Sequence, residues 1–324
     1  MTQTEIDFRT AIRDALAEEL EADPDVIFYG EDVAEPGGVF NATPGLFERF
    51  GPDRVFDTPI SELVMTGAAF GSAICGLRPV LEIMFGDFLT LSMDSLVNQA
   101  AKWFFLSNEQ TSVPLTIRSA TGGGGRFGAI HSQVPLSWFD GIPGLKIVSP
   151  STPGDAKALL KASIRDDDPV LFFEHKRLYS MKGALEPRVT RLGQAAVVRE
   201  GADVTLISVM RGVHDCLAAA SALSESGVDA EVIDLCSIRP LDLDTVLASV
   251  TKTNRLYLVE EGPRSGGWAS EVLAAVTEQA LEQLDDAWRI AAVDHPVPYS
   301  PPLEDAFFPS VDRIVAEIRE RVGA

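Results

Sequence analysis

The sequence has little that would support a disulfide framework or a membrane span. Its three cysteines, Cys75, Cys216 and Cys236, are scattered in apolar contexts and form no Cys-x-x-Cys pair, which favours buried free thiols in a reducing compartment. No apolar run approaches the roughly 20 residues that a bilayer span needs. Residues 1–5 contain neither a basic segment nor an apolar core, so we expect no signal peptide, no membrane association and a cytoplasmic location.

Positive charge is also scarce. The chain has 48 acidic residues against 27 basic ones, and its formal net charge is −21. A field of this sign repels phosphate backbones, which argues against nucleic-acid binding. The same charge would suit a basic protein partner, or it would simply keep the protein soluble.

What the chain does contain is enough apolar sequence for two globular domains. Hydrophobic residues make up 46% of its 324 residues, and two domains are the natural expectation at this length. Short apolar runs alternate with amphipathic segments in both halves, a pattern typical of parallel, doubly wound α/β sheets. A looser stretch rich in Gly, Pro, Arg and Glu separates them. We therefore predict domains at 1–185 and 201–324, joined by a linker at 186–200.

The most informative stretch runs from Phe56 to Glu62 and continues into the small-residue segment 65–73. A strand ending near Asp57 would be followed by a helix, with Thr58 as its cap and Pro59 at its first position. Glu62 then lies in the opening turn of that helix. On spacing alone, an acid there simply complements the positive end of the helix dipole.

The wider sequence resembles a known family over essentially its whole length. The resemblance rests on 56–73 and on Gly76-Leu77-Arg78-Pro79, Asn98-Gln99-Ala100-Ala101-Lys102, His131-Ser132-Gln133, Pro143-Gly144-Leu145-Lys146 and Ala162-Ser163-Ile164-Arg165-Asp166. These segments resemble the beta subunit of the thiamine-diphosphate-dependent component of 2-oxo acid dehydrogenase complexes. The resemblance implies a transketolase-like pyrimidine-binding domain followed by a transketolase C-terminal domain.

The resemblance also implies roles for four residues. Glu62 would hydrogen-bond the aminopyrimidine ring of thiamine diphosphate, Phe88 would stack on that ring, and Glu31 would point into the cofactor cavity. His131 would position the substrate and take part in proton transfer. The residues alone also allow plainer roles, which are a solvated loop acid for Glu31, core packing for Phe88 and a structural histidine for His131.

One familiar motif is missing. The superfamily holds magnesium diphosphate with a Gly-Asp-Gly motif followed by an asparagine, whereas this chain has Gly86-Asp87-Phe88. The resemblance therefore implies that this chain carries the pyrimidine half of the site, that a separate alpha subunit holds Mg²⁺ and the diphosphate, and that the enzyme is an α2β2 heterotetramer. Relatives also bind potassium in a loop that corresponds here to Leu115, Ser163, Ile164, Asp166 and Asp168. A solvated acidic turn is the alternative for that loop.

The expected function is decarboxylation of pyruvate or a branched-chain 2-oxo acid, with transfer of the acyl group to a lipoyl domain of a dihydrolipoyl acyltransferase core. The segment 174–183 looks like the acetoin-cleaving branch instead, so that activity is the alternative. A non-catalytic assembly subunit is an alternative of another class. The four glycines Gly122–Gly125 lack the spacing of a phosphate-binding loop and are expected to make a mobile loop.

Overall fold

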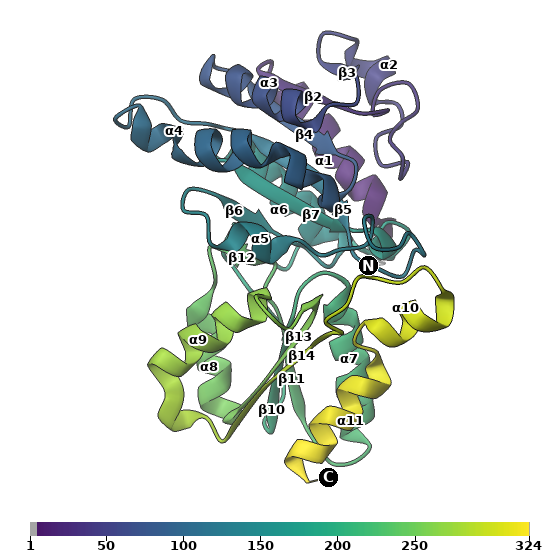
Figure 1. The fold of residues 1–324 in the computed structure, drawn as a ribbon, viewed down its shortest axis with the longest axis vertical. Coiled ribbons are helices and arrows are strands. Elements are labelled where there is room, and N and C mark those ends of the chain that lie inside the picture. Colours follow the sequence, from purple (N-terminus) through teal and green to yellow (C-terminus); the bar gives the residue numbers. More distant parts are fainter. Residues whose placement is uncertain (1–4, 324) are drawn as a thin grey trace.

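The apolar runs of the first half form a seven-stranded sheet in the computed structural model, which describes residues 5–323 (Figure 1). In spatial order the strands are β12 (Ser237–Arg239), β6 (Lys146–Val148), β7 (Val170–His175), β5 (Thr116–Thr121), β4 (Arg78–Ile83), β2 (Val26–Gly30) and β3 (Val55–Asp57). All neighbours pair in parallel except β12 and β6. The central strands are buried along almost their whole length, as expected for a parallel sheet covered on both faces.

Helices cover both faces of this sheet. They are α1 (Phe8–Ala22), α2 (Leu46–Phe50), α3 (Glu62–Ile74), the 3-10 helix η1 (Gly86–Ser92), the π-helix η2 (Asp94–Ala100), α4 (Ala101–Leu106), α5 (Leu136–Asp140), α6 (Pro153–Arg165) and the 3-10 helix η3 (Lys176–Leu178). Helix α1 packs against α6, whereas α3 packs against η1 and η2. Asp7 caps α1 by accepting a hydrogen bond from the Thr10 amide at 2.9 Å.

The second half forms its own five-stranded sheet. Its order is β14 (Asp286–Ala292), β13 (Arg255–Pro263), β10 (Val204–Ser208), β11 (Ala230–Asp234) and β9 (Ala196–Arg199). The flanking helices are α7 (Arg211–Ser224), α8 (Leu243–Thr253), α9 (Trp268–Ala280), the 3-10 helix η4 (Leu281–Gln283), α10 (Pro301–Phe307) and α11 (Val311–Val322). Helices α8 and α9 lie on one face, and α7 and α11 on the other (Figure 1). The predicted α/β class, with two sheets covered by helices, is confirmed.

Three pairs that involve short strands depart from the purely parallel pattern. Strand β9 lies within the stretch that we predicted as a linker and pairs antiparallel with β11. Strand β12 follows β11 in the chain, yet it leaves the second sheet and pairs antiparallel with β6 at the edge of the first. A third short pair, β1 (Glu5–Asp7) with β8 (Lys182–Ala184), is also antiparallel. Segments of three or four residues carry too little periodicity to be recognised in the sequence.

Three local expectations were wrong. The helix that follows β3 begins at Glu62 with Ser61 as its N-cap residue, so Thr58 and Pro59 precede it rather than open it. The apolar spacing of residues 89–106 predicts one long helix, but the segment is divided among η1, η2 and α4. Cys75 is exposed, because it follows the last residue of α3 at the surface, whereas Cys216 and Cys236 are buried as expected.

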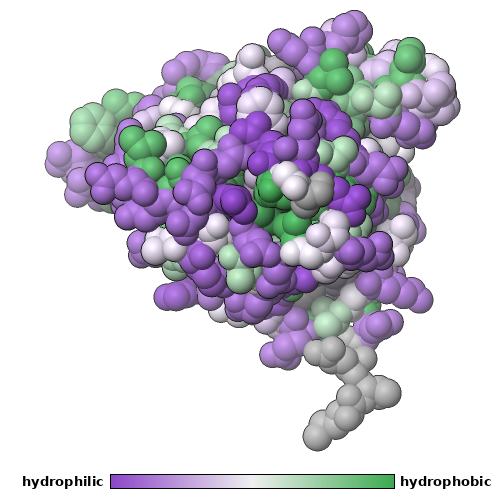
Figure 2. All heavy atoms as spheres, turned by 90° about the horizontal axis from the view of Figure 1, so that it is seen from below, coloured by the Kyte–Doolittle hydropathy of each residue, from purple (hydrophilic) through white to green (hydrophobic). Residues whose placement is uncertain are grey.

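One face of the molecule is largely polar. Figure 2 shows one face of the molecule, on which hydrophilic side chains predominate and apolar patches are small. No helix within residues 5–323 is both long enough and apolar enough to cross a bilayer.

Candidate functional site

The predicted cofactor residues lie at the carboxyl edge of the seven-stranded sheet, where β2, β3 and β4 end. The loops that follow β2 and β3 are tied together there, because the Thr58 amide donates to the Gly30 carbonyl at 2.9 Å and the Ala34 amide donates to Asp57 Oδ1 at 2.8 Å. A Cβ atom on Gly30 would lie 2.7 Å from the Glu82 carbonyl oxygen, so only glycine allows this approach of β2 to β4. The sheet edge therefore presents both loops to one side.

Glu62 opens α3 at this edge and is 6% exposed. The helix is held against the sheet by Tyr29, whose ring stacks on Phe56 at 4.9 Å and whose hydroxyl donates to the Met65 carbonyl at 3.1 Å. The small residues of α3 allow η2 to pack closely on its other side, since a Cβ atom on Gly67 would lie 3.4 Å from Ser95 Oγ. Packing from both sides fixes where the Glu62 carboxylate emerges.

Glu31 follows β2 and lies near enough to Glu62 to be affected by its charge. Burial and the negative charges of Glu62 and Asp32 together raise the pKa of the Glu31 carboxyl group. Its Oε1 atom is buried and has no hydrogen-bond partner. Asp32, the next residue, adopts a left-handed backbone with φ 55°. An unpaired buried carboxylate oxygen beside a strained backbone is typical of a site built for a ligand.

Phe88 and His131 meet over the same edge. The imidazole of His131 lies 5.2 Å from the Phe88 ring and 4.7 Å from the Phe85 ring, with interplanar angles of 78° and 85°. Phe88 belongs to η1, whereas His131 comes from the loop after β5, so the fold brings together two segments that are distant in sequence. The structure thus places Phe88 and His131 in one aromatic cluster with Phe85.

Two charged residues at this cluster were missed in the sequence. Asp87 is buried, accepts a hydrogen bond from Gln133 Nε2 at 2.7 Å through Oδ1, and leaves Oδ2 without a partner. Lys176 contacts the His131 carbonyl oxygen with its Nζ atom. The sequence of segment 174–183 indicates only a likeness to acetoin-cleaving relatives. Nothing in its spacing reveals that Lys176 reaches the His131 loop.

The glycine-rich loop after β5 is packed between the two halves of the chain. A Cβ atom on Gly122 would lie 2.1 Å from the His175 ring, and one on Gly123 would lie 2.0 Å from Phe308. The Gly124 amide donates to Glu304 Oε1 at 3.0 Å. Glycine is therefore required here for steric reasons that do not depend on mobility, because side chains from several elements approach the backbone.

Beneath the site, Arg118 on β5 is 1% exposed and forms ion pairs with two carboxylates. Its Nε and Nη2 atoms donate to Glu174 at 2.7 and 2.9 Å, and Nη1 donates to Glu82 at 2.7 Å. Burial raises the pKa of Glu82 even though the guanidinium opposes this rise. The three residues link β4, β5 and β7 near the ends that carry the site.

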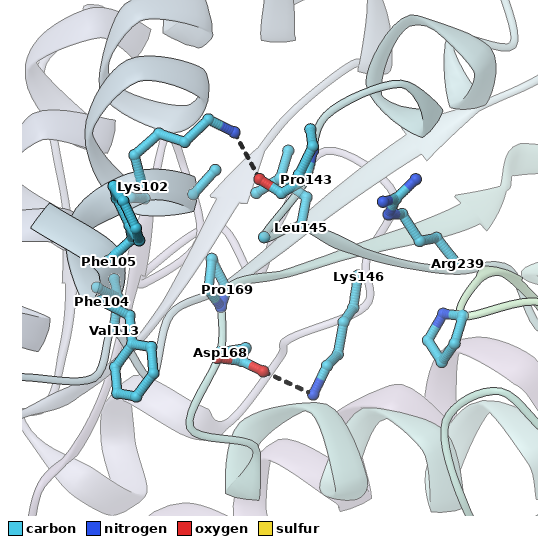
Figure 3. Close-up of a pocket in the computed structure, with 14 residues that line it drawn as sticks. Lys102, Phe104, Phe105, Val113, Pro143, Leu145, Lys146, Asp168, Pro169 and Arg239 are labelled. Atoms are coloured by element: carbon cyan, nitrogen blue, oxygen red, sulfur yellow. Dashed lines mark hydrogen bonds and ion pairs between the residues drawn. The ribbon is translucent and has the colours of Figure 1, made fainter. Parts of the chain in front are cut away.

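The predicted potassium loop lies at the carboxyl end of α6 and is folded onto the start of β5. The carbonyl oxygens of Ile164 and Asp166 converge on one atom, Arg78 Nη1, at 3.2 and 3.1 Å. The Leu115 carbonyl accepts from the Val170 amide, and the Ser163 carbonyl accepts from the Asp166 amide. Lys146 Nζ lies 3.0 Å from the Asp168 carboxylate and 2.8 Å from that of Asp166. Figure 3 marks the ion pair with Asp168. The five residues are brought together, and potassium binding stays a prediction.

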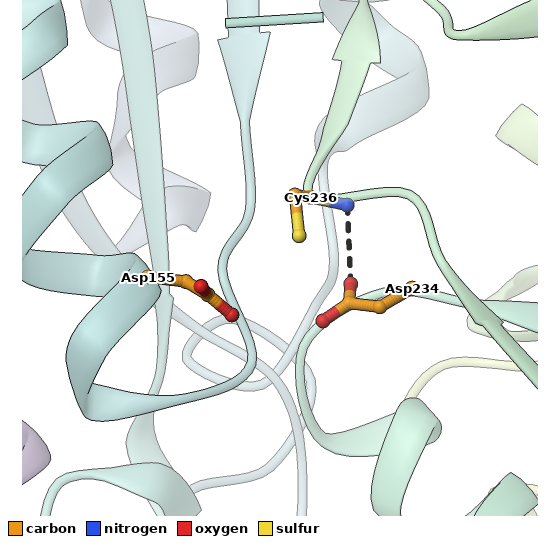
Figure 4. A group of neighbouring side chains, drawn as sticks. All are labelled: Asp155, Asp234 and Cys236. Carbon is orange, nitrogen blue, oxygen red and sulfur yellow. Dashed lines mark hydrogen bonds between the residues drawn. The ribbon is translucent and has the colours of Figure 1, made fainter. Parts of the chain in front are cut away.

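A second group of potential ligands lies between the two sheets. The ligating atoms of Asp155, Asp234 and Cys236 all lie within 4.8 Å of one another (Figure 4). The guanidinium of Arg188 fills this cluster, donating to Asp155 Oδ2 through Nε at 2.7 Å and to Asp234 Oδ2 through Nη2 at 2.6 Å. Burial raises the pKa of the Cys236 thiol well above its usual range. A protonated thiol and a resident cation make this an ion-paired interdomain contact.

The remaining histidines lie outside the aromatic cluster. His175 is buried and its Nε2 atom lies 2.8 Å from Glu261 Oε2, which joins β7 of the first sheet to β13 of the second. His214 Nε2 contacts the Ser151 carbonyl at 2.8 Å, and His295 is exposed.

Comparisons with known proteins agree with this architecture. The family described as "Transketolase, pyrimidine binding domain" matches residues 4–182, and "Transketolase, C-terminal domain" matches residues 193–314. A structure titled "Split gene transketolase, inactive beta4 tetramer" shares the fold with a TM-score of 0.82, covering 97% of this chain and 98% of that chain at 21% identity.

Three curated relatives cover nearly the whole chain. The 2-oxoisovalerate dehydrogenase subunit beta of Bacillus subtilis (strain 168) is 44% identical, covering 96% of both proteins. The acetoin:2,6-dichlorophenolindophenol oxidoreductase subunit beta of Cupriavidus necator is 41% identical over 97% of both. The mitochondrial pyruvate dehydrogenase E1 component subunit beta-1 of Arabidopsis thaliana is 42% identical over 96% of this chain and 88% of its own length. The chain therefore belongs to the transketolase-like family of beta subunits of the thiamine-diphosphate-dependent component of 2-oxo acid dehydrogenase complexes.

Proposed function

We propose that this chain supplies the pyrimidine half of a thiamine diphosphate site, and that with a separate alpha subunit it decarboxylates a 2-oxo acid and transfers the acyl group to a lipoyl domain. The observation that carries the proposal is the neighbouring pair Glu31 and Glu62, two buried carboxylates at a sheet edge, one of them with an unpaired oxygen. Buried carboxylates with an unpaired oxygen are suited to hydrogen-bonding a heterocycle that exchanges protons.

The residues of this chain divide the work by position. Glu62 and Glu31 would hold the pyrimidine through hydrogen bonds, and Phe88 would offer it an aromatic face. His131, in contact with Phe88, would orient the substrate and exchange a proton with it. When bound, thiamine diphosphate supplies the carbon nucleophile that cleaves the bond next to the substrate carbonyl.

The surface around Glu62 is suited to binding a partner subunit. Ile60, Leu63, Val64 and Leu91 are exposed apolar residues at the start of α3 and on the neighbouring η1, and Ile60 is 83% exposed. An apolar rim of this kind around a polar site is typical of a protein interface. It supports the α2β2 assembly, in which the alpha subunit would hold Mg²⁺ and the diphosphate and complete the cavity. Docking to an acyltransferase core and a cytoplasmic location belong to the same proposal.

The proposal is tested by titrating thiamine diphosphate and Mg²⁺ into this chain, into its alpha partner and into their mixture by calorimetry. We expect tight, magnesium-dependent binding in the mixture alone. Equally tight binding by this chain without its partner would contradict the divided site. Binding no tighter in the mixture than in either subunit would favour the non-catalytic assembly role.

Acetoin cleavage is the second candidate, and it is favoured by the relative from Cupriavidus necator. A substrate panel on the reconstituted complex, with pyruvate, branched-chain 2-oxo acids and acetoin, decides between the candidates. The preferred substrate is the one with the highest kcat/KM.

A further inference from the structure

We propose that Lys176 is a positioning residue for His131: its ammonium group holds the His131 backbone so that the imidazole stays against Phe85 and Phe88. The inference rests on the proposed function of this site. It concerns how the His131 loop is held in place.

The placement of Lys176 is the first observation. It follows directly after β7, next to the buried residue His175, and its Nζ atom contacts the His131 carbonyl oxygen. The same Nζ atom lies 5.2 Å from the ring centroids of both Phe85 and Phe127. One ammonium group therefore lies against Phe85, which follows β4, and against two points of the loop after β5, Phe127 and His131.

The aromatic rings transmit this contact to the site. Phe85 lies 6.0 Å from Phe127, 5.7 Å from Phe88 and 4.7 Å from His131. Lys176 thus supports the side of the cluster that His131 and Phe88 complete. A cation beside two aromatic faces stabilises such a cluster, provided that the cation keeps its charge.

Charge retention is governed by the groups around Lys176. Burial lowers the pKa of its ammonium group to about 8, while Asp87 on η1, Glu261 on β13 and Glu304 on α10 oppose the fall. At neutral pH most of the lysine is still protonated. Above pH 8 it becomes a neutral amine, which loses the attraction to the two rings.

Other residues hold the parts of the loop on either side of His131, so the contribution of Lys176 can be separated from theirs. Arg126 Nη1 donates to Glu304 Oε2 at 2.7 Å, and its Nη2 atom donates to Asp305 at 2.7 Å. Gln133, on the other side of His131, is held by Asp87. Between these anchors, the Lys176 contact fixes the backbone of His131 itself.

The test uses two readouts on K176M, K176R and the control K182M, whose lysine is exposed on β8. The first readout is the NMR signal of the His131 Hε1 proton in the full chain, isotopically labelled at its four histidines. The signal is assigned as the one that is missing in H131N. The second is turnover of the reconstituted complex from pH 6 to 9. If K176M does not fold, judged by circular dichroism, K176Q replaces it.

We expect the His131 signal, shifted upfield by the neighbouring rings, to move towards its unstructured position in K176M and to stay near the wild-type position in K176R and K182M. Turnover of K176M should fall on the order of 10-fold to 100-fold, a usual effect of small misplacement. Wild-type turnover should decline above pH 8, where Lys176 loses its charge, and K176M should show no such decline. K176R should restore most activity.

An unchanged His131 signal in K176M, whatever its turnover, overturns the positioning role. A shifted signal with wild-type turnover overturns its importance for the reaction. If the wild-type complex turns over neither 2-oxo acids nor acetoin, the proposed function fails, and the spectra alone decide whether Lys176 positions His131.

Discussion

The carboxylate of Glu62 lies close enough to that of Glu31 for its negative charge to raise the pKa of Glu31. The two side chains come from different strand ends, and the ties between the loops after β2 and β3 bring them together. Two buried like charges are costly unless a ligand with hydrogen-bond donors takes up the unpaired oxygen. The pair is thus a feature that stability alone would not favour.

Substitution of Glu62 by Gln should leave the fold intact and lower turnover of the reconstituted complex by roughly 10²–10⁴-fold, the usual contribution of a positioned acid–base group. Steady-state kinetics measure the effect. E48Q, at an exposed glutamate on α2, is the matched control and should behave as wild type. Near-normal turnover in E62Q would remove Glu62 from the mechanism.

Glu260 should make stability depend on pH. It is 2% exposed, and burial raises the pKa of its carboxyl group to about 7, although Arg289 and the backbone amides of Ala269 and Trp268 oppose the rise. Because the folded chain holds this proton more tightly than the unfolded chain, the free energy of unfolding should fall as pH rises from about 4.5 to about 7. The loss attributable to this group is about 3 kcal/mol.

Urea unfolding of wild type and E260Q at pH 5 and pH 8 checks this assignment. E260Q should lose less stability than wild type between the two pH values, whereas E278Q, at an exposed position on α9, should match wild type. Equal pH dependence in E260Q and wild type would show that Glu260 is not the responsible group.

Removing the Arg118 guanidinium should be severely destabilising. R118M leaves Glu82 and Glu174 buried without their cation, and we expect the free energy of unfolding to fall by about 3–5 kcal/mol. The control R49M removes a surface partner of Glu21 and should cost less than about 1 kcal/mol. Chemical unfolding of both variants measures the difference, and comparable losses would contradict the assignment of Arg118 as a buried structural cation.

Metal ions should not affect the cluster of Asp155, Asp234 and Cys236. Arg188 already donates hydrogen bonds to both carboxylates, and the thiol stays protonated. EDTA should leave the melting temperature of the full chain unchanged, and Zn²⁺ calorimetry should detect no site that C236S removes. R188M should lower the melting temperature, because it leaves two buried carboxylates unpaired. A zinc site lost in C236S would overturn this interpretation.

The alternating apolar and amphipathic segments predicted the α/β class, and the resemblance to a known family predicted the transketolase-like fold. It also singled out Glu31, Glu62, Phe88 and His131, which the fold gathers at one sheet edge, although their roles stay predictions. Lys176, Asp87 and Arg118 were missed as site or support residues. Each acts through a contact with a residue distant in sequence, and a single sequence carries no signal of such a contact.

Strand β12 has a consequence for dividing this protein. The matched families suggest a cut between 182 and 193, but such a cut would leave Ser237–Arg239 on the carboxyl-terminal fragment. The amino-terminal fragment would then present Lys146–Val148 as an open edge, ready to recruit a foreign strand and aggregate. Chimaeras that exchange halves between relatives must therefore match this seam as carefully as the cofactor residues.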